Sequence, residues 1–163
     1  METKETIQRI HSQWLIAKEQ RRQRCQASNK TEVANRLAAC RLFSGKETLP
    51  EVARLFKSPQ GIEFCLAANF PTLATLRMFK SSCPEQFGIY IDAGNITLTD
   101  PGTVILIGRT SATIHCNQCQ NNTIVTMHGA AATVLASGWA VVRTEAGAGT
   151  NIVRRTSDNA IIL

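Results

Sequence analysis

The chain has 163 residues, long enough for one domain with a real core or for a small helical unit joined to a small β unit. Its formal charge is +6, from 18 Lys and Arg against 12 Asp and Glu. It starts with METKETIQRI, which lacks the apolar run of a secretory signal, and polar residues interrupt every long uncharged stretch. From these features we expect a cytoplasmic protein that is neither exported nor membrane-spanning and that contacts no membrane.

The basic charge belongs to one half of the sequence. Residues 1–86 hold 14 Lys and Arg against 8 Asp and Glu, whereas residues 87–163 hold 4 of each. A basic half suits an acidic partner such as nucleic acid. The stretch KEQRRQR would supply the contacts through Lys18, Arg21, Arg22 and Arg24, and these side chains would bind the nucleic-acid backbone rather than read its sequence.

The first 86 residues predict about five helices from the spacing of their apolar residues. Two helix starts carry capping signals. Thr48 and Glu51 have the spacing of a capping box, and Ser58 precedes Pro59 as a cap precedes a first helical residue. The expected buried positions are Ile7, Ile10, Trp14 and Leu15 in the first helix and Val33, Leu37 and Cys40 in the second.

The composition changes after Phe87, where Val, Ile and Thr dominate and Gly and Asn recur. A short strand, a corner of small residues and a second short strand then recur, as IYIDAGNITL, VILIGRTSATIHC, VTMHGAAATVLAS and AVVRTEAGAGTNIVRR. Such repeats indicate a β-solenoid, in which one coil buries its apolar face only by stacking on the next. The fold class is therefore α+β: a helical unit over residues 1–86 and a β-solenoid of about four short coils over residues 87–163. A β-sandwich or jelly roll is the alternative.

Alternation along each strand predicts which side chains enter the solenoid core. The first strands of the coils would contribute Ile89, Ile91, Val104, Leu106, Val125, Met127, Ala140 and Val142. The second strands would contribute Ile96, Leu98, Ala112, Ile114, Cys116, Ala132, Val134, Ala136, Thr150 and Ile152.

The same alternation leaves an outward set of apolar residues, which we interpret as a protein-interaction surface: Ile105, Ile107, Leu135, Val141 and Val153. The simpler explanation is that the chain's own helices cover these residues. The open ends of a solenoid are strand edges that can pair with another molecule. We therefore expect a protein partner, with a second copy of the chain as one candidate.

The stretch IHCNQCQNN suggests a metal site because it brings His115, Cys116 and Cys119 together in sequence, and His128 follows. Zinc needs four ligands in tetrahedral geometry, and a single CxxC supplies half of them. In a β-strand, however, His115 and Cys116 would point to opposite faces. We therefore interpret Cys116 as a core residue and Cys119 as an exposed thiol on a polar corner, with zinc binding as a lesser alternative.

No common catalytic template occurs in the sequence. GxSxG, the P-loop, GxGxxG and HExxH are missing, and the four carboxylates of the β half form no close pair in sequence. We therefore expect a protein that is not an enzyme and needs no cofactor.

The helical head, the SPQGIEF junction and the tail of short β repeats are similar to uncharacterised small proteins of gut bacteria and their mobile elements. That resemblance implies no activity. Residues 89–163 also resemble the polymer-forming bactofilins, whose fold is a β-solenoid, although the helical head departs from that family. The leading hypothesis is a non-enzymatic interaction or assembly protein, followed by a nucleic-acid-associated protein and then a zinc-binding protein.

Overall fold

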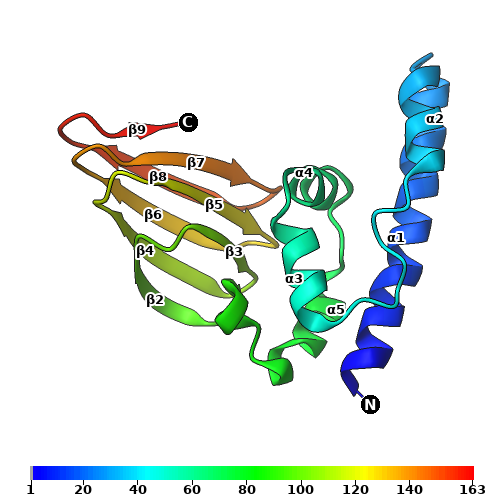
Figure 1. The fold of residues 1–163 in the computed structure, drawn as a ribbon, viewed down its shortest axis with the longest axis horizontal. Coiled ribbons are helices and arrows are strands. Elements are labelled where there is room, and N and C mark those ends of the chain that lie inside the picture. The colour runs from blue at the N-terminus through cyan, green and yellow to red at the C-terminus, as the bar shows by residue number, and fades with distance from the viewer. Residues whose placement is uncertain (1) are drawn as a thin grey trace. The chain divides into compact units, whose positions relative to one another are not determined.

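The computed structural model describes residues 2–163 and divides the chain into two compact units, Met1–Met78 and Phe79–Leu163. The first unit is helical and the second is a parallel β-solenoid of about four turns, so the expected α+β class is confirmed (Figure 1). The boundary between the units lies eight residues before the change of composition at Phe87. None of the described helices is both long enough and apolar enough to cross a membrane.

The helical unit contains α1 (Glu2–Ala27), α2 (Thr31–Ala39), α3 (Leu49–Lys57), α4 (Pro59–Ala68) and α5 (Leu73–Met78). The predicted caps are present. Thr48 and Glu51 form a capping box at α3, and the Ser58 hydroxyl accepts a hydrogen bond from the Gly61 N–H at the start of α4. These caps satisfy N–H groups that would otherwise lack partners at both helix starts.

The core of the helical unit matches the predicted spacing in α1 but not at every position. Ile7, Ile10 and Trp14 are buried, while Leu15 is 44% exposed. In α2 the buried residue is Ala34, and the predicted Val33 is 46% exposed. The spacing of apolar residues predicts which residues of a helix are buried only to within about one position. The apolar stripe is wider than the line along which the helix packs against its neighbours.

The solenoid unit begins with two short 3₁₀ helices, η1 (Lys80–Ser82) and η2 (Pro84–Phe87). Its first sheet has the order β1-β3-β5-β7-β9 and its second the order β2-β4-β6-β8, with every neighbouring pair parallel. The strands are β1 (Ile89–Ile91), β2 (Gly94–Thr99), β3 (Thr103–Ile107), β4 (Thr110–Cys116), β5 (Asn121–Met127), β6 (Ala131–Ala136), β7 (Val141–Ala146), β8 (Asn151–Thr156) and β9 (Ile161–Ile162).

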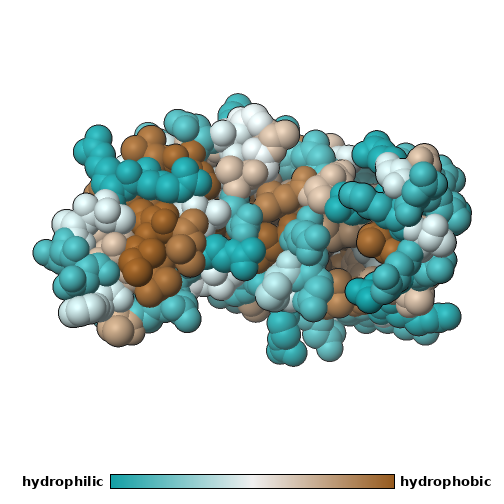
Figure 2. All heavy atoms as spheres, turned by 90° about the horizontal axis from the view of Figure 1, so that it is seen from above, coloured by the Kyte–Doolittle hydropathy of each residue, from teal (hydrophilic) through white to brown (hydrophobic). Residues whose placement is uncertain are grey.

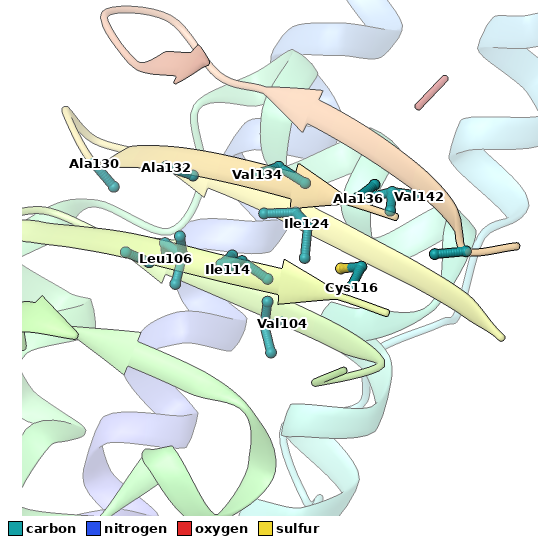
Figure 3. Close-up of a cluster of buried hydrophobic side chains, with 12 residues drawn as sticks. Val104, Leu106, Ile114, Cys116, Ile124, Ala130, Ala132, Val134, Ala136 and Val142 are labelled. Atoms are coloured by element: carbon teal, nitrogen blue, oxygen red, sulfur yellow. The ribbon is translucent and has the colours of Figure 1, made fainter. Parts of the chain in front are cut away.

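The core between the two sheets confirms the prediction for the second sheet. Ile96, Ala112, Ala132 and Ile152 are in register, and Leu98, Ile114 and Val134 form the adjacent row. Figure 3 shows the buried side chains of both sheets directed into the space between them. Alanines at five of the twelve buried core positions keep the two sheets close, as a narrow core requires.

The prediction for the first sheet is wrong at four positions. Ile89, Ile91, Val125 and Met127 are in register with Ile105 and Ile107 on the outer face, while Val104, Leu106 and Ile124 belong to the core. The repeats, aligned by their first residues, match Val104 with Val125. The true partner of Val104 is Ile124, one residue earlier. A slip of one residue moves every side chain to the other face.

Aspartates at the corners hold successive coils together. Asp92, Asp100 and Asp158 have positive φ angles of 46°, 44° and 58°. Each carboxylate accepts a backbone N–H from the next or preceding coil: Arg109 at 2.8 Å, Asn117 at 2.8 Å and Gly138 at 3.0 Å, respectively. Asp tolerates the left-handed conformation because its short polar side chain bonds locally.

Candidate functional site

The residues of the suspected zinc site do not come together in the structure. Cys116 is fully buried in register with Ala136, and His115 lies on the opposite, outer face of β4. Cys119 is exposed on the corner between β4 and β5. Within residues 2–163, no three His, Cys, Asp or Glu side chains gather as metal ligands.

Burial also determines the chemistry of the core thiol. Burial, with a smaller contribution from the Asp100 carboxylate, raises the pKa of Cys116 to about 11. A thiol with that pKa stays protonated at neutral pH and is a poor nucleophile and metal ligand. Cys83 is exposed as well as Cys119, so the sequence had identified one of two exposed thiols.

The four basic candidates of α1 divide into two pairs. Lys18 Nζ lies 4.7 Å from the centre of the Trp14 ring and donates a hydrogen bond to the Cys40 carbonyl at 3.1 Å. Arg22 binds both carboxylate oxygens of Glu19 at 2.6 and 2.8 Å, and the guanidinium hydrogen bond lowers the pKa of Glu19 to about 2. Lys18 and Arg22 are therefore engaged in local contacts.

The other two, Arg21 and Arg24, line a polar cavity of about 40 Å³ with four further residues: Ala17, Gln20, Ala67 and Ala68. Arg21 and Arg24 thus lie together between α1 and the end of α4. The nucleic-acid hypothesis depends mainly on these two side chains.

The carboxylates of the solenoid unit have structural partners. The three corner aspartates accept backbone N–H groups, as described above, and Glu145 forms an ion pair with Arg143 at 2.6 Å.

The outward apolar residues named from the sequence do not form one surface. Ile105 and Ile107 are 4% and 1% exposed, so neither is available to a partner. Leu135 is half-buried and Val153 is 39% exposed, both on the outer face of the second sheet. Val141 is half-buried on β7, in the terminal coil.

A more prominent apolar cluster surrounds Val141 in the terminal coil. Val141 is in register with Ile161 of β9, Trp139 precedes Val141 by two residues, and Leu163 follows Ile161 by two. Trp139, Ile161 and Leu163 are 67%, 53% and 70% exposed. We call these four residues the terminal patch, and Figure 2 shows apolar side chains gathered over this end of the solenoid and surrounded by polar ones.

The backbone beneath the terminal patch is well ordered by hydrogen bonds. The Leu163 N–H donates to the Val142 carbonyl at 2.7 Å, and the Leu163 carbonyl accepts from both the N–H and the hydroxyl of Thr144 at 2.9 Å. The Arg143–Glu145 ion pair lies on the same strand, next to the apolar residues. The patch therefore combines a fixed backbone with exposed apolar side chains and a charged rim.

Comparison of the chain with protein-family models, with curated proteins and with solved structures finds no match. The function is therefore inferred from the geometry of the chain alone. Sequence reasoning identified Val141 but missed Trp139. A tryptophan in a solenoid corner was the available signal, because corners otherwise hold small and polar residues.

Proposed function

We propose that this chain is a non-enzymatic protein-interaction module whose solenoid presents the terminal patch to another protein. The observation that carries the proposal is the exposure of Trp139, Ile161 and Leu163 on the last coil and on the strand β9 stacked on it. Exposed apolar clusters with a polar rim commonly mark protein-binding sites, and tryptophan is enriched among the residues that dominate binding energy.

The partner is inferred from the chemistry of the patch. Its centre requires an apolar segment of the partner chain. Its rim carries Arg143, whose side chain is 62% exposed, and Arg154 is exposed at the open end of the same coil. An apolar segment flanked by an acidic residue would complement both features.

The solenoid supports this role by presenting the patch without a large ordering cost. Parallel pairing runs through all nine described strands of the solenoid, and β9 is held to β7 by main-chain hydrogen bonds. A surface that is already ordered loses little conformational entropy on binding, so a larger share of its contact energy appears as affinity.

The test begins with a photo-crosslinking amino acid at Asn159, an exposed residue whose N–H bonds to the carbonyl of Gly138, beside Trp139. Crosslinked partners would be identified in cells that naturally make the protein and then purified. We expect Trp139→Ser and Leu163→Ser each to weaken binding of the purified partner about tenfold or more. A crosslinked protein that binds the Trp139→Ser and Leu163→Ser variants as tightly as the unmodified chain would not support the proposal.

The matched control is Leu42→Ser, which removes an exposed leucine from the helical unit. This variant should bind the partner as the unmodified chain does. If the patch variants and the control bind the partner equally well, the terminal patch is not the binding site and the proposal is wrong.

A further inference from the structure

The free edge of β2 offers unpaired backbone groups in a regular row. β2 is the first strand of the sheet β2-β4-β6-β8, so only one of its sides is paired. The Gly94 and Asp100 N–H groups donate to β4-side carbonyls at 2.9 and 2.8 Å. In a parallel pair the N–H and C=O of one residue point the same way and alternate along the strand. The backbone groups of Asn95, Thr97 and Thr99 therefore point to the free side.

This edge carries none of the usual protection against pairing. The strand GNITLT contains no charged residue and no proline, and Asn95, Thr97 and Thr99 are exposed. Ile96 and Leu98 point into the solenoid but remain half-buried, because no further coil covers them. Strands of this kind are templates for pairing with another chain.

The edge at the other end of the same sheet is protected. Arg154 of β8 occupies the core row of Val134 and Ile114, so a charged side chain lies where the core would continue. Its Nε donates to the Thr144 hydroxyl at 2.9 Å, across the open end of the solenoid. An inward-pointing charge is a recognised device against edge pairing. The two ends of the sheet therefore differ in what they can bind.

We propose that a second copy of the chain pairs with β2 in antiparallel register, about a twofold axis at Thr97. In this register Thr97 faces Thr97 of the second copy, Asn95 faces Thr99, and Ile96 faces Leu98. All three residues with free backbone groups then form hydrogen-bonded pairs, each exchanging two N–H···O bonds. The inward face pairs apolar with apolar residues, and the outward face pairs polar with polar residues.

The charges next to β2 agree with this register. Asp100 would face Gly94 of the second copy, so no two carboxylates of the dimer are opposite each other. The Asp100 carboxylate is already bonded to the Asn117 and Gln118 N–H groups at 2.8 and 3.1 Å. Antiparallel pairing of β8 with itself about a twofold axis at Arg154 would instead place Arg154 against Arg154, and like charges opposite each other are destabilising. A dimer through β2 is therefore favoured over one through β8.

This inference goes beyond the proposed partner protein, because it uses the opposite end of the solenoid and a different occupant. The test is sedimentation of the full chain over a range of concentrations. We expect a monomer–dimer equilibrium, in which Thr97→Lys and Thr97→Glu each raise the dissociation constant about tenfold, because they place like charges opposite each other. An equimolar mixture of the two variants should restore the dimer, since opposite charges then meet at the axis.

The control is Ser111→Lys, which adds the same charge to an exposed residue of the same face, one strand away from the edge. This variant should dimerise as the unmodified chain does. A chain that stays monomeric at all concentrations, a dimer that Thr97→Lys leaves intact, or a variant mixture that fails to re-form the dimer would each overturn the inference. A dimer lost with Leu163→Ser but kept with Thr97→Lys would also overturn it, and would assign the terminal patch to a second copy.

Discussion

The cysteines show how burial separates structural from reactive side chains in this chain. Cys65 and Cys116 are buried, and burial raises the pKa of Cys65 to about 12 and contributes most to raising that of Cys116 to about 11. Cys83 and Cys119 are exposed. Because the thiolate is the reactive form, exposure favours alkylation of Cys83 and Cys119, whereas burial suppresses the thiolates of Cys65 and Cys116.

We expect iodoacetamide at pH 8 to label Cys83 and Cys119 at least about tenfold faster than Cys65 and Cys116, since each pKa unit reduces the thiolate fraction tenfold. Mass spectrometry of peptides at successive times measures the four rates. In urea all four thiols should react at similar rates, which controls for intrinsic differences. Labelling of Cys116 as fast as Cys119 in the folded chain would contradict its place in the core.

At the scale of elements, the junction between α3 and α4 depends on one glycine. A Cβ built on Gly61 would lie 1.9 Å from the backbone carbonyl oxygen of Leu55. The Leu55 carbonyl oxygen has little freedom to move. Leu55 belongs to the last turn of α3, and its oxygen accepts hydrogen bonds from the N–H and the hydroxyl of Ser58. The two helices can therefore meet this closely only where a side chain is missing.

Gly61→Ala should destabilise the chain by about 1–3 kcal/mol, the usual cost of overpacking a close contact, even though alanine favours helices. Urea unfolding followed by circular dichroism would measure the change. Glu63→Ala, an exposed substitution in the same helix, is the control and should change the free energy of unfolding by less than about 0.5 kcal/mol. Equal stability of the two variants would show that the junction opens at little cost.

The strands of the solenoid show where sequence reasoning succeeds and where it fails. In β4 and β6 apolar inward residues alternate with outward residues that are polar or small, except for Leu135, and the predicted core rows are correct. In β3 both faces are apolar, and in β5 the inward row carries Thr126 while Val125 and Met127 lie on the outer face, so the apolar residues do not indicate which face is inward. There the buried polar residue Thr126 lies inside, satisfied by the Thr150 hydroxyl at 2.9 Å, while Val125 lies outside.

The candidate sites show the same limit. The separation of His115 from Cys116 follows from strand geometry alone and was predicted. The terminal patch depends on which turns of chain remain uncovered, and no local pattern carries that information. The hydrogen bond from Lys18 to the Cys40 carbonyl also joins residues that are far apart in sequence. Contacts of this kind follow from tertiary packing, which composition and periodicity do not encode.

At the scale of the whole molecule, the two ends of the solenoid control how many copies can assemble. An end-to-end stack of solenoids would need both β2 and β8 to pair. In the native chain Arg154 would bring a charge into the core row at every β8 junction, and burying an unpaired charge is costly. We therefore expect assembly to stop at the dimer formed through β2.

Arg154→Leu should remove this block, because leucine would continue the row of Val134 and Ile114. Thr144 keeps a hydrogen-bond partner in the variant, since its hydroxyl also donates to the Leu163 carbonyl. With both edges able to pair, we expect species larger than a dimer, measured by light scattering after size exclusion. Adding Thr97→Lys should return the assembly to two copies, now joined through β8.

Arg155→Leu is the control for added surface hydrophobicity. Arg155 is the neighbouring residue, but it is in register with Leu135 on the outer face and does not enter the core row. This variant should keep the size of the unmodified chain. If Arg154→Leu and Arg155→Leu enlarge the assembly equally, growth comes from exposed leucine in general, and Arg154 has no special role at the end of the solenoid. Growth with Arg154→Leu alone would identify the inward charge as the element that limits assembly.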